Sequence, residues 1–183
     1  IRLMGNKAAA KRRMREAGVP CIPGYDGSDQ SDATLMREAE KVGLPLMIKA
    51  AAGGGGRGMR RVDNPESFAE AVASAQREAE AGFGDNRVII EKFVARARHI
   101  EVQIFGDGKG GVIALGERDC SIQRRHQKLL EEAPSTISTP ELRKAMGDAA
   151  VRAAKAVGYS SAGTMEFLVD KQNNFYFMEM NTR

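Results

Sequence analysis

The chain has 183 residues, of which 42% are hydrophobic and 28% charged, and these values are ordinary for a folded protein of one or two small domains. No apolar run is long enough to span a bilayer and no short apolar segment follows a basic start, so we expect a soluble, cytosolic protein. The net charge of +4 would permit nucleic-acid binding, but aromatic residues make up only 5% of the chain and leave few stacking platforms; small anionic ligands explain the charge equally well.

The cysteines and the chain ends give two further expectations. Cys21 and Cys120 lie far apart, without a Cys-x-x-Cys pair or a histidine cluster, so the sequence indicates neither a disulfide framework nor a zinc site. The chain begins with Ile1, and its last predicted strand runs into a polar cluster and stops at Arg183. We therefore expect it to be a fragment of a longer protein.

The first half of the chain alternates between helix and strand signals. A capping residue before a helix-forming segment and a glycine after it are typical of helix ends. These capping and glycine signals, with Pro65 as a further start signal, predict helices over residues 7–17, 32–42 and 65–81. Short apolar runs predict strands over residues 46–49, 59–62 and 88–94.

The second half is dominated by strand signals. Alternating apolar residues predict an antiparallel pair over residues 100–105 and 112–115, joined by a turn at Gly106-Asp107-Gly108. Two more strands, over residues 163–169 and 175–180, form a second hairpin. Between these pairs a helix opens at residues 138–141, where Ser138 and Glu141 have the spacing of a capping box, and it ends before Gly158.

A glycine-rich segment lies between two of the predicted strands. From Lys49 to Met59 it is Lys-Ala-Ala-Ala-Gly-Gly-Gly-Gly-Arg-Gly-Met, which has neither the spacing of a P-loop nor that of the dinucleotide-binding fingerprint. Glycines let the backbone adopt positive φ and bring N–H groups against a bound group, while the flanking cations supply charge. We predict a flap that folds over phosphates, with a flexible linker as the alternative.

Two acids lie inside the apolar runs of the last predicted hairpin. Glu166 and Glu179 would be costly to bury unless they met a cation or another partner. Together with Asn181 they offer oxygen ligands that suit Mg²⁺ or Mn²⁺ bound to substrate phosphates. The alternative is a pair of exposed acids at a sheet edge.

The segment from Glu117 to Lys128 is dense in side chains that bind phosphate, carboxylate or bicarbonate. Basic runs are common and usually exposed, so a solvated loop is the alternative.

The chain resembles the central part of biotin carboxylase, the ATP-grasp component of biotin-dependent carboxylases that act on acyl-CoA or pyruvate. The resemblance covers essentially the whole chain. The matching stretches, in order, are Met4-Gly5-Asn6-Lys7, residues 49–59, residues 98–103, residues 117–128, Glu131-Glu132-Ala133-Pro134, residues 163–167 and residues 179–183. The resemblance implies an α+β, ATP-grasp fold with antiparallel sheets, helices and a glycine-rich flap subdomain, incomplete here. It divides the chain into a connector helix (1–24), a lid subdomain with the flap (25–93) and a C-terminal subdomain (94–183) truncated at the metal-binding strand.

The resemblance also implies roles for individual residues. The lysines that contact ATP phosphates match Lys7 and Lys49, and the flap that closes over them matches Gly54, Gly55 and Gly56. The segment that hydrogen-bonds adenine matches Glu91, Lys92 and Val94, with Met59 packing on the base. The residues around the ribose and phosphates match His99, Gln123 and His126. The metal ligands match Glu166, Glu179 and Asn181, and the catalytic residues that hold bicarbonate and the anionic intermediates match Lys128 and Arg183.

In the family that the chain resembles, ATP phosphorylates bicarbonate to carboxyphosphate, which yields CO₂ for the N1′ atom of biotin. The resemblance therefore implies ATP with Mg²⁺ or Mn²⁺, biotin on a carrier protein or domain, a carboxyltransferase partner and a homo-oligomeric parent enzyme, without nucleic acid or membrane. A eukaryotic parent would lie in the mitochondrial matrix.

Two departures from the family pattern matter. Ala52 stands where many members begin a longer glycine run, a change that we expect to be tolerated. The family's N-terminal domain, bicarbonate-binding loop, general base and biotin-contacting arginine would lie outside residues 1–183, so we expect this polypeptide alone not to carboxylate biotin. The alternatives are another ATP-grasp ligase such as one of carbamoyl phosphate synthetase type, a non-catalytic ATP-binding module, and a basic nucleic-acid binder.

Overall fold

The computed structural model describes residues 6–52, 58–125 and 127–182, which divide into two compact units. The first, here called the small-sheet unit, comprises Arg2–Ala10 and Ile22–Phe93. The second, the large-sheet unit, comprises Lys11–Cys21 and Val94–Arg183, together with Ile1. Helix α1 (Lys7–Glu16) contributes residues to both units, and the Asn6 carboxamide caps it by accepting a hydrogen bond from Ala9 N at 2.9 Å.

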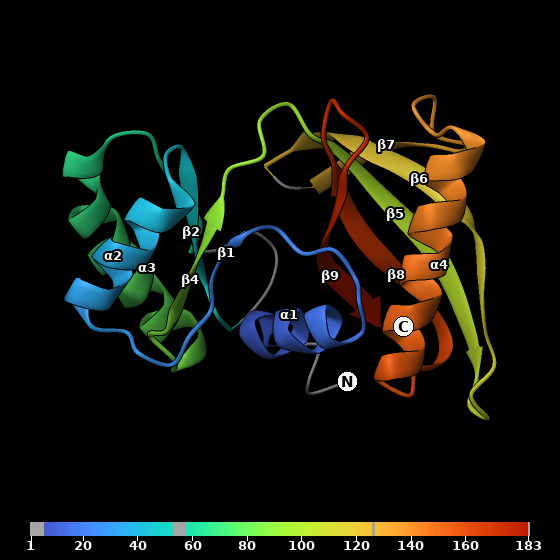
Figure 1. Ribbon diagram of the computed structural model, residues 1–183, viewed down its shortest axis with the longest axis horizontal. Coiled ribbons are helices and arrows are strands. Elements are labelled where there is room, and N and C mark those ends of the chain that lie inside the picture. The colour runs from blue at the N-terminus through green and yellow to red at the C-terminus, as the bar shows by residue number, and fades with distance from the viewer. Residues whose placement is uncertain (1–5, 53–57, 126, 183) are drawn as a thin grey trace. The chain divides into compact units, whose positions relative to one another are not determined.

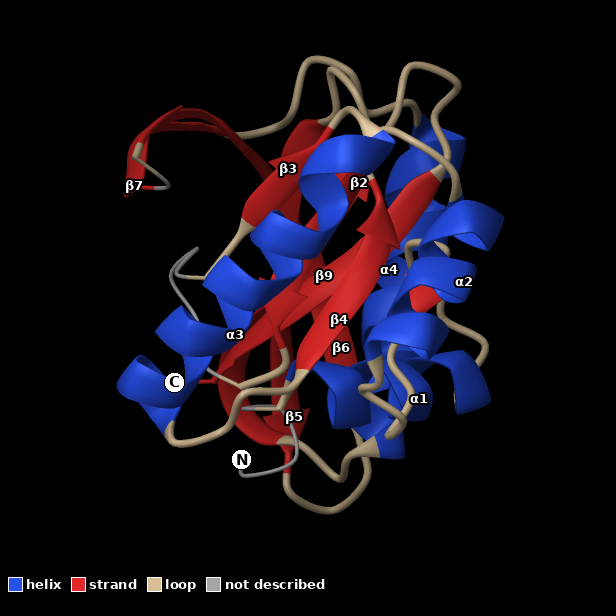
Figure 2. Ribbon diagram, turned by 90° about the vertical axis from the view of Figure 1, so that its left-hand side faces the viewer, coloured by secondary structure: helices blue, strands red, loops and turns tan. Residues whose placement is uncertain are grey.

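The small-sheet unit is an antiparallel sheet covered by two helices (Figure 1). Its strands lie in the order β1 (Gly24–Tyr25), β4 (Val88–Lys92), β2 (Leu46–Ala50) and β3 (Arg60–Val62). The helices are α2 (Asp32–Val42) and α3 (Phe68–Phe83), the latter preceded by the short 3₁₀ helix η1 (Pro65–Ser67). Figure 2 views the helix side of this unit, with the strands behind α2 and α3.

Alternation along the strands separates the two faces of the small sheet. Leu46, Ile48 and Ile90 pack with residues of α2 and α3 into one apolar core. Ile89 points to the other face and packs with Ala8 and Ala51. Lys49 and Glu91 lie on the same face as Ile89, because alternate residues of a strand point in the same direction.

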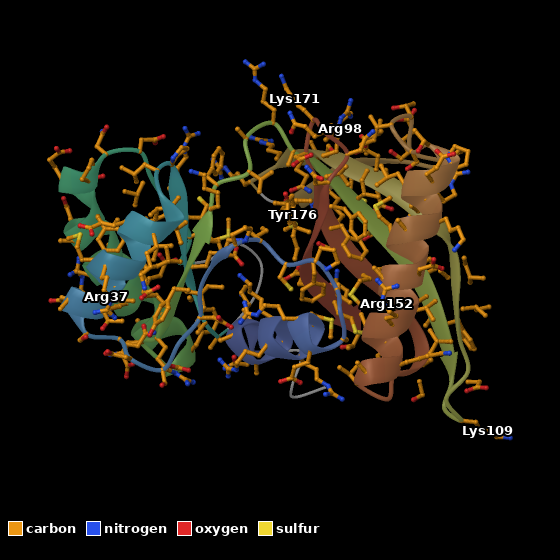
Figure 3. All side chains as sticks on the ribbon, viewed as in Figure 1. Arg37, Arg98, Lys109, Arg152, Lys171 and Tyr176 are labelled. Carbon is orange, nitrogen blue, oxygen red and sulfur yellow. The ribbon has the colours of Figure 1, made fainter. Side chains whose placement is uncertain are left out.

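The large-sheet unit is a five-stranded antiparallel sheet with α4 (Pro140–Ala156) on one face. The strand order is β7 (Gln127–Glu132), β6 (Val112–Arg124), β5 (Arg98–Asp107), β8 (Ser160–Val169) and β9 (Phe175–Thr182). Helix α4 packs on β5 and β6 through a buried face rich in alanine, which allows a close approach of helix and sheet. Figure 3 places Arg98 and Lys171 at one end of this sheet and Lys109 at the other.

Strand β5 divides its side chains between the two faces of the large sheet. Ile100, Val102 and Ile104 are buried, and Val102 lines a cavity together with residues of α4. His99, Glu101 and Gln103 alternate with them and therefore point to the opposite face. This second face is the polar face of the large sheet.

Most predicted elements are confirmed, and three predictions need correction. The turn predicted at Gly106-Asp107-Gly108 lies later in the chain, because β5 continues to Asp107 and the bends are at residues 108–110. Strand β6 continues to Arg124, so the solvated-loop alternative for residues 117–128 is wrong over most of that segment. The N-cap of α4 is Thr139 rather than Ser138: Thr139 Oγ1 accepts a hydrogen bond from Leu142 N at 3.2 Å, and Pro140 occupies the first turn. The division into residues 1–24, 25–93 and 94–183 stays a prediction. In the described part of the chain no helix is both long and apolar enough to cross a membrane.

Candidate functional site

A row of charged side chains crosses the polar face of the large sheet. The antiparallel register sets Arg118 of β6 opposite Glu101 of β5, Glu101 opposite Glu166 of β8, and Glu166 opposite Glu179 of β9. Residues directly opposite each other on antiparallel strands share a face and have Cβ atoms about 5 Å apart. Four strands thus bring together side chains that lie far apart in the sequence.

Lys128 of β7 reaches into this row. Its Nζ donates to Glu101 Oε2 at 2.5 Å and to Glu166 Oε1 at 2.7 Å, and both carboxylates are almost fully buried. Burial alone would lower the pKa of Lys128, but the hydrogen bonds to Glu101 and Glu166 outweigh it and raise the pKa above its usual value. Lys128 is therefore a fixed positive charge at neutral pH.

Glu166 receives three hydrogen-bond donors from three strands. Besides Lys128, Asn181 Nδ2 donates to Oε1 at 2.5 Å, and His99 Nε2 lies 2.6 Å from Oε2. Burial alone would raise the pKa of Glu166, but the bonds from His99 and Lys128 outweigh it and lower the pKa to about 2. This carboxylate stays ionised in the folded protein across the physiological range.

His99 is held on both of its ring nitrogens. Gln123 Nε2 lies 2.6 Å from His99 Nδ1 and also donates to Cys120 O at 2.7 Å. If Nδ1 accepts from the Gln123 amide, the imidazole proton is on Nε2 and points at Glu166. Two residues predicted to lie near the ribose and phosphates, His99 and Gln123, are thus in direct contact in the structure.

The three predicted metal ligands lie on the same face of the last hairpin. Glu166 and Glu179 are opposite each other, and Asn181 bonds to Glu166. Two carboxylates and one amide oxygen form the hard-oxygen donor set that Mg²⁺ and Mn²⁺ prefer, so these residues fit such a cation. An ion bound here would share the oxygens of Glu166 with Lys128, Asn181 and His99, which contact them.

A second group of potential ligands lies beside this row, formed by Glu101, Cys120 and Glu131, with one ligand atom of each within 4.8 Å of the others. Burial, and next the charge of Glu101, raise the pKa of the Cys120 thiol to about 12, so without a metal ion the thiol is protonated at neutral pH. Glu101 already holds Arg118 and Lys128. We therefore assign no metal ion to this group.

The small-sheet unit carries the predicted phosphate-binding lysines. Lys49 of β2 forms an ion pair of 2.5 Å with Glu91 of β4, and both side chains are largely buried. Lys7 begins α1, where its N–H donates to Ala51 O at 2.9 Å and brings the helix start next to the end of β2. Lys49 is thus the first residue of the glycine-rich segment, and Lys7 lies beside Ala51, the third residue of that segment.

The residues predicted to bind adenine differ in their contacts and in the unit to which they belong. Lys92 Nζ donates to the carbonyl oxygens of Gly43 and Leu44, at 3.2 and 2.9 Å, so this ammonium group binds the chain that follows α2. Val94 belongs to the large-sheet unit, whereas Glu91 and Lys92 belong to the small-sheet unit. Met59 is partly buried directly before β3.

Five predicted residues lie outside the described residues: Gly54, Gly55, Gly56, His126 and Arg183. The strands on either side of the glycines are described and pair as an antiparallel hairpin, with Leu46 opposite Val62 and Ile48 opposite Arg60. The hairpin that was predicted to carry the flap is thus confirmed up to its ends.

Sequence reasoning missed Glu101 and Arg118. Glu101 Oε1 accepts a hydrogen bond from Arg118 Nε at 2.7 Å and forms an ion pair of 2.5 Å with Arg118 Nη2, while Glu101 Oε2 accepts from Lys128. The available signal was the alternation of residues 100–105, which predicts a polar face without showing whether that face is exposed or forms a site.

The chain matches the family described as carbamoyl-phosphate synthase L chain, ATP binding domain, over residues 6–183. It is 57% identical over its whole length to the mitochondrial methylcrotonoyl-CoA carboxylase subunit alpha of Dictyostelium discoideum, and also 57% identical to the chloroplastic biotin carboxylase 1 of Populus trichocarpa. It spans only 26% and 35% of those two proteins.

Solved structures agree with these relatives. A biotin carboxylase complex from Campylobacter jejuni, described as a β,γ-ATP complex, superimposes with a TM-score of 0.95 and 52% identity, covering 100% of this chain and 41% of that one. The biotin carboxylase domain of the 2-oxoglutarate carboxylase of Hydrogenobacter thermophilus, in complex with MgADP, ADP and bicarbonate, gives a TM-score of 0.94 at 50% identity, covering 100% and 40%. The α+β, ATP-grasp expectation and the resemblance to biotin carboxylases are both confirmed, and the chain belongs to the family of carbamoyl-phosphate synthase L chain ATP-binding domains.

Proposed function

We propose that this chain is the ATP-binding part of a biotin carboxylase, in which ATP and bicarbonate form carboxyphosphate and the carboxyl group passes to biotin. The observation that carries the proposal is the partly buried Lys128 ammonium, held at 2.5 and 2.7 Å between the buried carboxylates of Glu101 and Glu166 beside the predicted metal ligands. A fixed cation next to an oxygen-rich metal site suits a reaction in which negative charge moves onto transferring oxygens.

Lys7 and Lys49 would bind the phosphates of ATP, with the flap of Gly54, Gly55 and Gly56 closing over them and excluding water. Their support is the position of both lysines beside the start of the glycine-rich segment. Glu91, Lys92 and Val94 would bind the adenine, with Met59 against the base. This role rests on the family resemblance, because the Lys92 ammonium group is engaged at the end of α2 and the Lys92 N–H donates to Pro23 O at 2.9 Å.

Glu166, Glu179 and Asn181 would hold Mg²⁺ or Mn²⁺ together with the phosphates of the nucleotide. The ion supplies positive charge to phosphate oxygens that become more negative during transfer. His99, Gln123 and His126 would line the nucleotide beside this site. Support for the arrangement comes from the contact of His99 with both Glu166 and Gln123.

Lys128 and Arg183 would hold bicarbonate and the anionic intermediates. The raised pKa of Lys128 keeps its ammonium protonated, so it orients an anion and stabilises negative charge rather than acting as a base. Biotin would arrive on a carrier protein or domain and pass its carboxyl group to a carboxyltransferase, and the parent enzyme would be a homo-oligomer. The protein would lie in the cytosol, or in an organelle such as the chloroplast or the mitochondrion, which are named for plant and animal relatives.

The test uses the full-length protein, because the chain spans about a quarter to two fifths of the relatives that it matches. ATP hydrolysis is measured with and without bicarbonate and free biotin, beside a Lys128→Ala variant. We expect hydrolysis that requires bicarbonate in the parent and is lost in the variant. Hydrolysis that is independent of bicarbonate, or equal in the two proteins, would contradict the proposal.

A further inference from the structure

Helix α3 contacts the chain at the end of the glycine-rich segment. The carboxylate of Glu78, on α3, accepts a hydrogen bond from Gly58 N at 3.0 Å through Oε1 and from Arg60 Nη2 at 2.8 Å through Oε2. Gly58 and Arg60 flank Met59, which is predicted to pack on the adenine. We propose that Glu78 is a positioning residue for Met59; the inference rests on the proposed function, in which Met59 contacts the base of ATP.

Gly58 needs an external restraint, because its own chemistry leaves the backbone free. It has a left-handed φ of 68°, and a Cβ at this position would lie 3.2 Å from Ala50 Cβ, closer than an ordinary van der Waals contact. A glycine has a wide choice of backbone conformations, so the residue type permits this conformation without selecting it. The bond from Gly58 N to Glu78 selects it, and with it the direction in which the chain enters Met59.

Arg60 restrains the other side of Met59. Its Nη1 donates to Met59 O at 3.0 Å, while Nη2 donates to Glu78 Oε2 and lies 3.4 Å from Ser74 Oγ. An arginine side chain is long and has many rotamers, and a carboxylate holds its planar guanidinium in one orientation. Glu78 therefore acts on both sides of Met59: directly on the N–H before it, and through Arg60 on its own carbonyl group.

The face to which Met59 belongs suits a contact with the nucleotide. Arg60 is opposite Ile48 of β2, which packs with residues of α2 and α3, so Arg60 lies on the helix face of the small sheet. Because side chains alternate along a strand, we expect Met59, one residue earlier, to be directed to the other face. That face carries Lys49 and Glu91, which are predicted to bind phosphate and adenine. Helix α3 thus holds, from the helix side, a residue directed to the predicted nucleotide site.

The second helix of the same unit offers a matched control. Glu38 of α2 accepts from Lys41 Nζ at 2.7 Å and lies 3.4 Å from Arg37 Nε. Like Glu78, it is a helical glutamate that bonds to a cation at hydrogen-bond distance. The two cations bonded to Glu38 are on α2 itself. Glu38→Ala therefore removes a helical ion pair without changing the contacts of Gly58 and Arg60.

The experiment measures the Mg-ATP dissociation constant, the KM values for ATP and bicarbonate, and thermal unfolding in the full-length protein and its variants. Alanine is the best helix former, so Glu78→Ala and Glu38→Ala keep their helices. For Glu78→Ala we expect the Mg-ATP dissociation constant and the KM for ATP to rise about fivefold, with the bicarbonate KM changed less than about twofold. Glu78→Gln keeps an acceptor for Gly58 but loses the charge that holds Arg60, so its rise should be smaller. Glu38→Ala should leave the Mg-ATP dissociation constant unchanged.

A double-mutant cycle separates the placement of Met59 from a general effect on the fold. In a protein that already carries Met59→Ala, Glu78→Ala should change the Mg-ATP dissociation constant by less than about twofold, because the side chain that it positions is gone. A purely structural role of Glu78 would give the same rise in both backgrounds.

The outcomes distinguish this inference from the proposed function. Mg-ATP binding in the parent with an unchanged dissociation constant in Glu78→Ala would overturn the positioning role and leave the proposed function intact. A rise that persists in the Met59→Ala background, or an equal rise in Glu38→Ala, would overturn the positioning role as well. A parent that does not bind Mg-ATP would refute the proposed function, and the role of Glu78 with it. If Glu78→Ala does not fold, Glu78→Gln in the two backgrounds decides, and a dissociation constant that it leaves unchanged refutes the inference.

Discussion

Replacement of Lys128 by methionine leaves two almost fully buried carboxylates opposite each other without the cation that bridges them. Glu101 and Glu166 each lose a hydrogen bond to Lys128, of 2.5 and 2.7 Å, but Glu101 keeps Arg118 and Glu166 keeps Asn181 and His99. Loss of one partner of a buried ion pair costs about 3 to 5 kcal/mol. Because the other partners remain, we expect the lower end, about 3 kcal/mol at pH 7.

The pH dependence of this loss of folding stability follows from the pKa of Glu166. Its pKa of about 2 in the folded protein lies below the usual value of 4.5, so its ionised form stabilises the fold fully above pH 4.5, and this contribution is lost as the pH falls through 2. Lys128 is one cause of the lowered pKa, and without it the pKa of Glu166 rises and the carboxylate protonates more easily. The difference in stability between the parent and Lys128→Met should therefore be smaller at about pH 4 than at pH 7.

Hydrogen exchange of β5 and β8 peptides in the full-length protein measures this difference as an opening free energy. Lys144→Met is the control, since Lys144 forms an exposed ion pair with Asp148 on α4 and should change stability by less than about 1 kcal/mol. A loss in Lys128→Met no greater than that of the control, or a loss that grows as the pH falls, would refute the reasoning.

Three further predictions concern other elements. Lys49→Met should weaken Mg-ATP binding by about tenfold in calorimetry, because it removes a phosphate-binding cation; unchanged affinity would exclude the predicted contact. Glu166→Gln should raise the Mg²⁺ concentration required for half-maximal ATP binding, since an amide is a weaker ligand than a carboxylate, and an unaltered Mg²⁺ requirement would argue against Glu166 as a ligand. Thr139→Ala should destabilise α4 by about 1 kcal/mol in thermal unfolding, whereas Ser138→Ala should cost less, and the reverse order would contradict the cap assignment.

The sequence predicted elements well where local chemistry decides their ends. Helix α2 spans Asp32–Val42 as expected, because Ser31 caps its start and Gly43 has a positive φ of 72° at its end. The start of α4 was misplaced by one residue, since Ser138 and Thr139 are both good caps and the choice depends on which hydroxyl reaches a helical N–H. Local signals could not separate these two arrangements.

The candidate site was harder to predict because it depends on pairing between strands. The alternation of β5 indicates that Glu101 shares a face with His99, but not that Arg118 and Lys128 reach it from β6 and β7. The extension of β6 through a charged segment was missed for the same reason. Glu117 and Asp119 are buried in this strand because they bond to Arg143 and Arg98, and no local sequence pattern predicts those partners.

Transfer of the carboxyl group from bicarbonate to biotin is tested most directly by following isotopically labelled bicarbonate in the full-length protein. With ATP, Mg²⁺ and free biotin present, we predict label in carboxybiotin, and no label when ATP is omitted or Lys128 is replaced by alanine. Label that enters a carbamoyl group from an added nitrogen donor instead of biotin, or no transfer of label despite ATP hydrolysis, would contradict it.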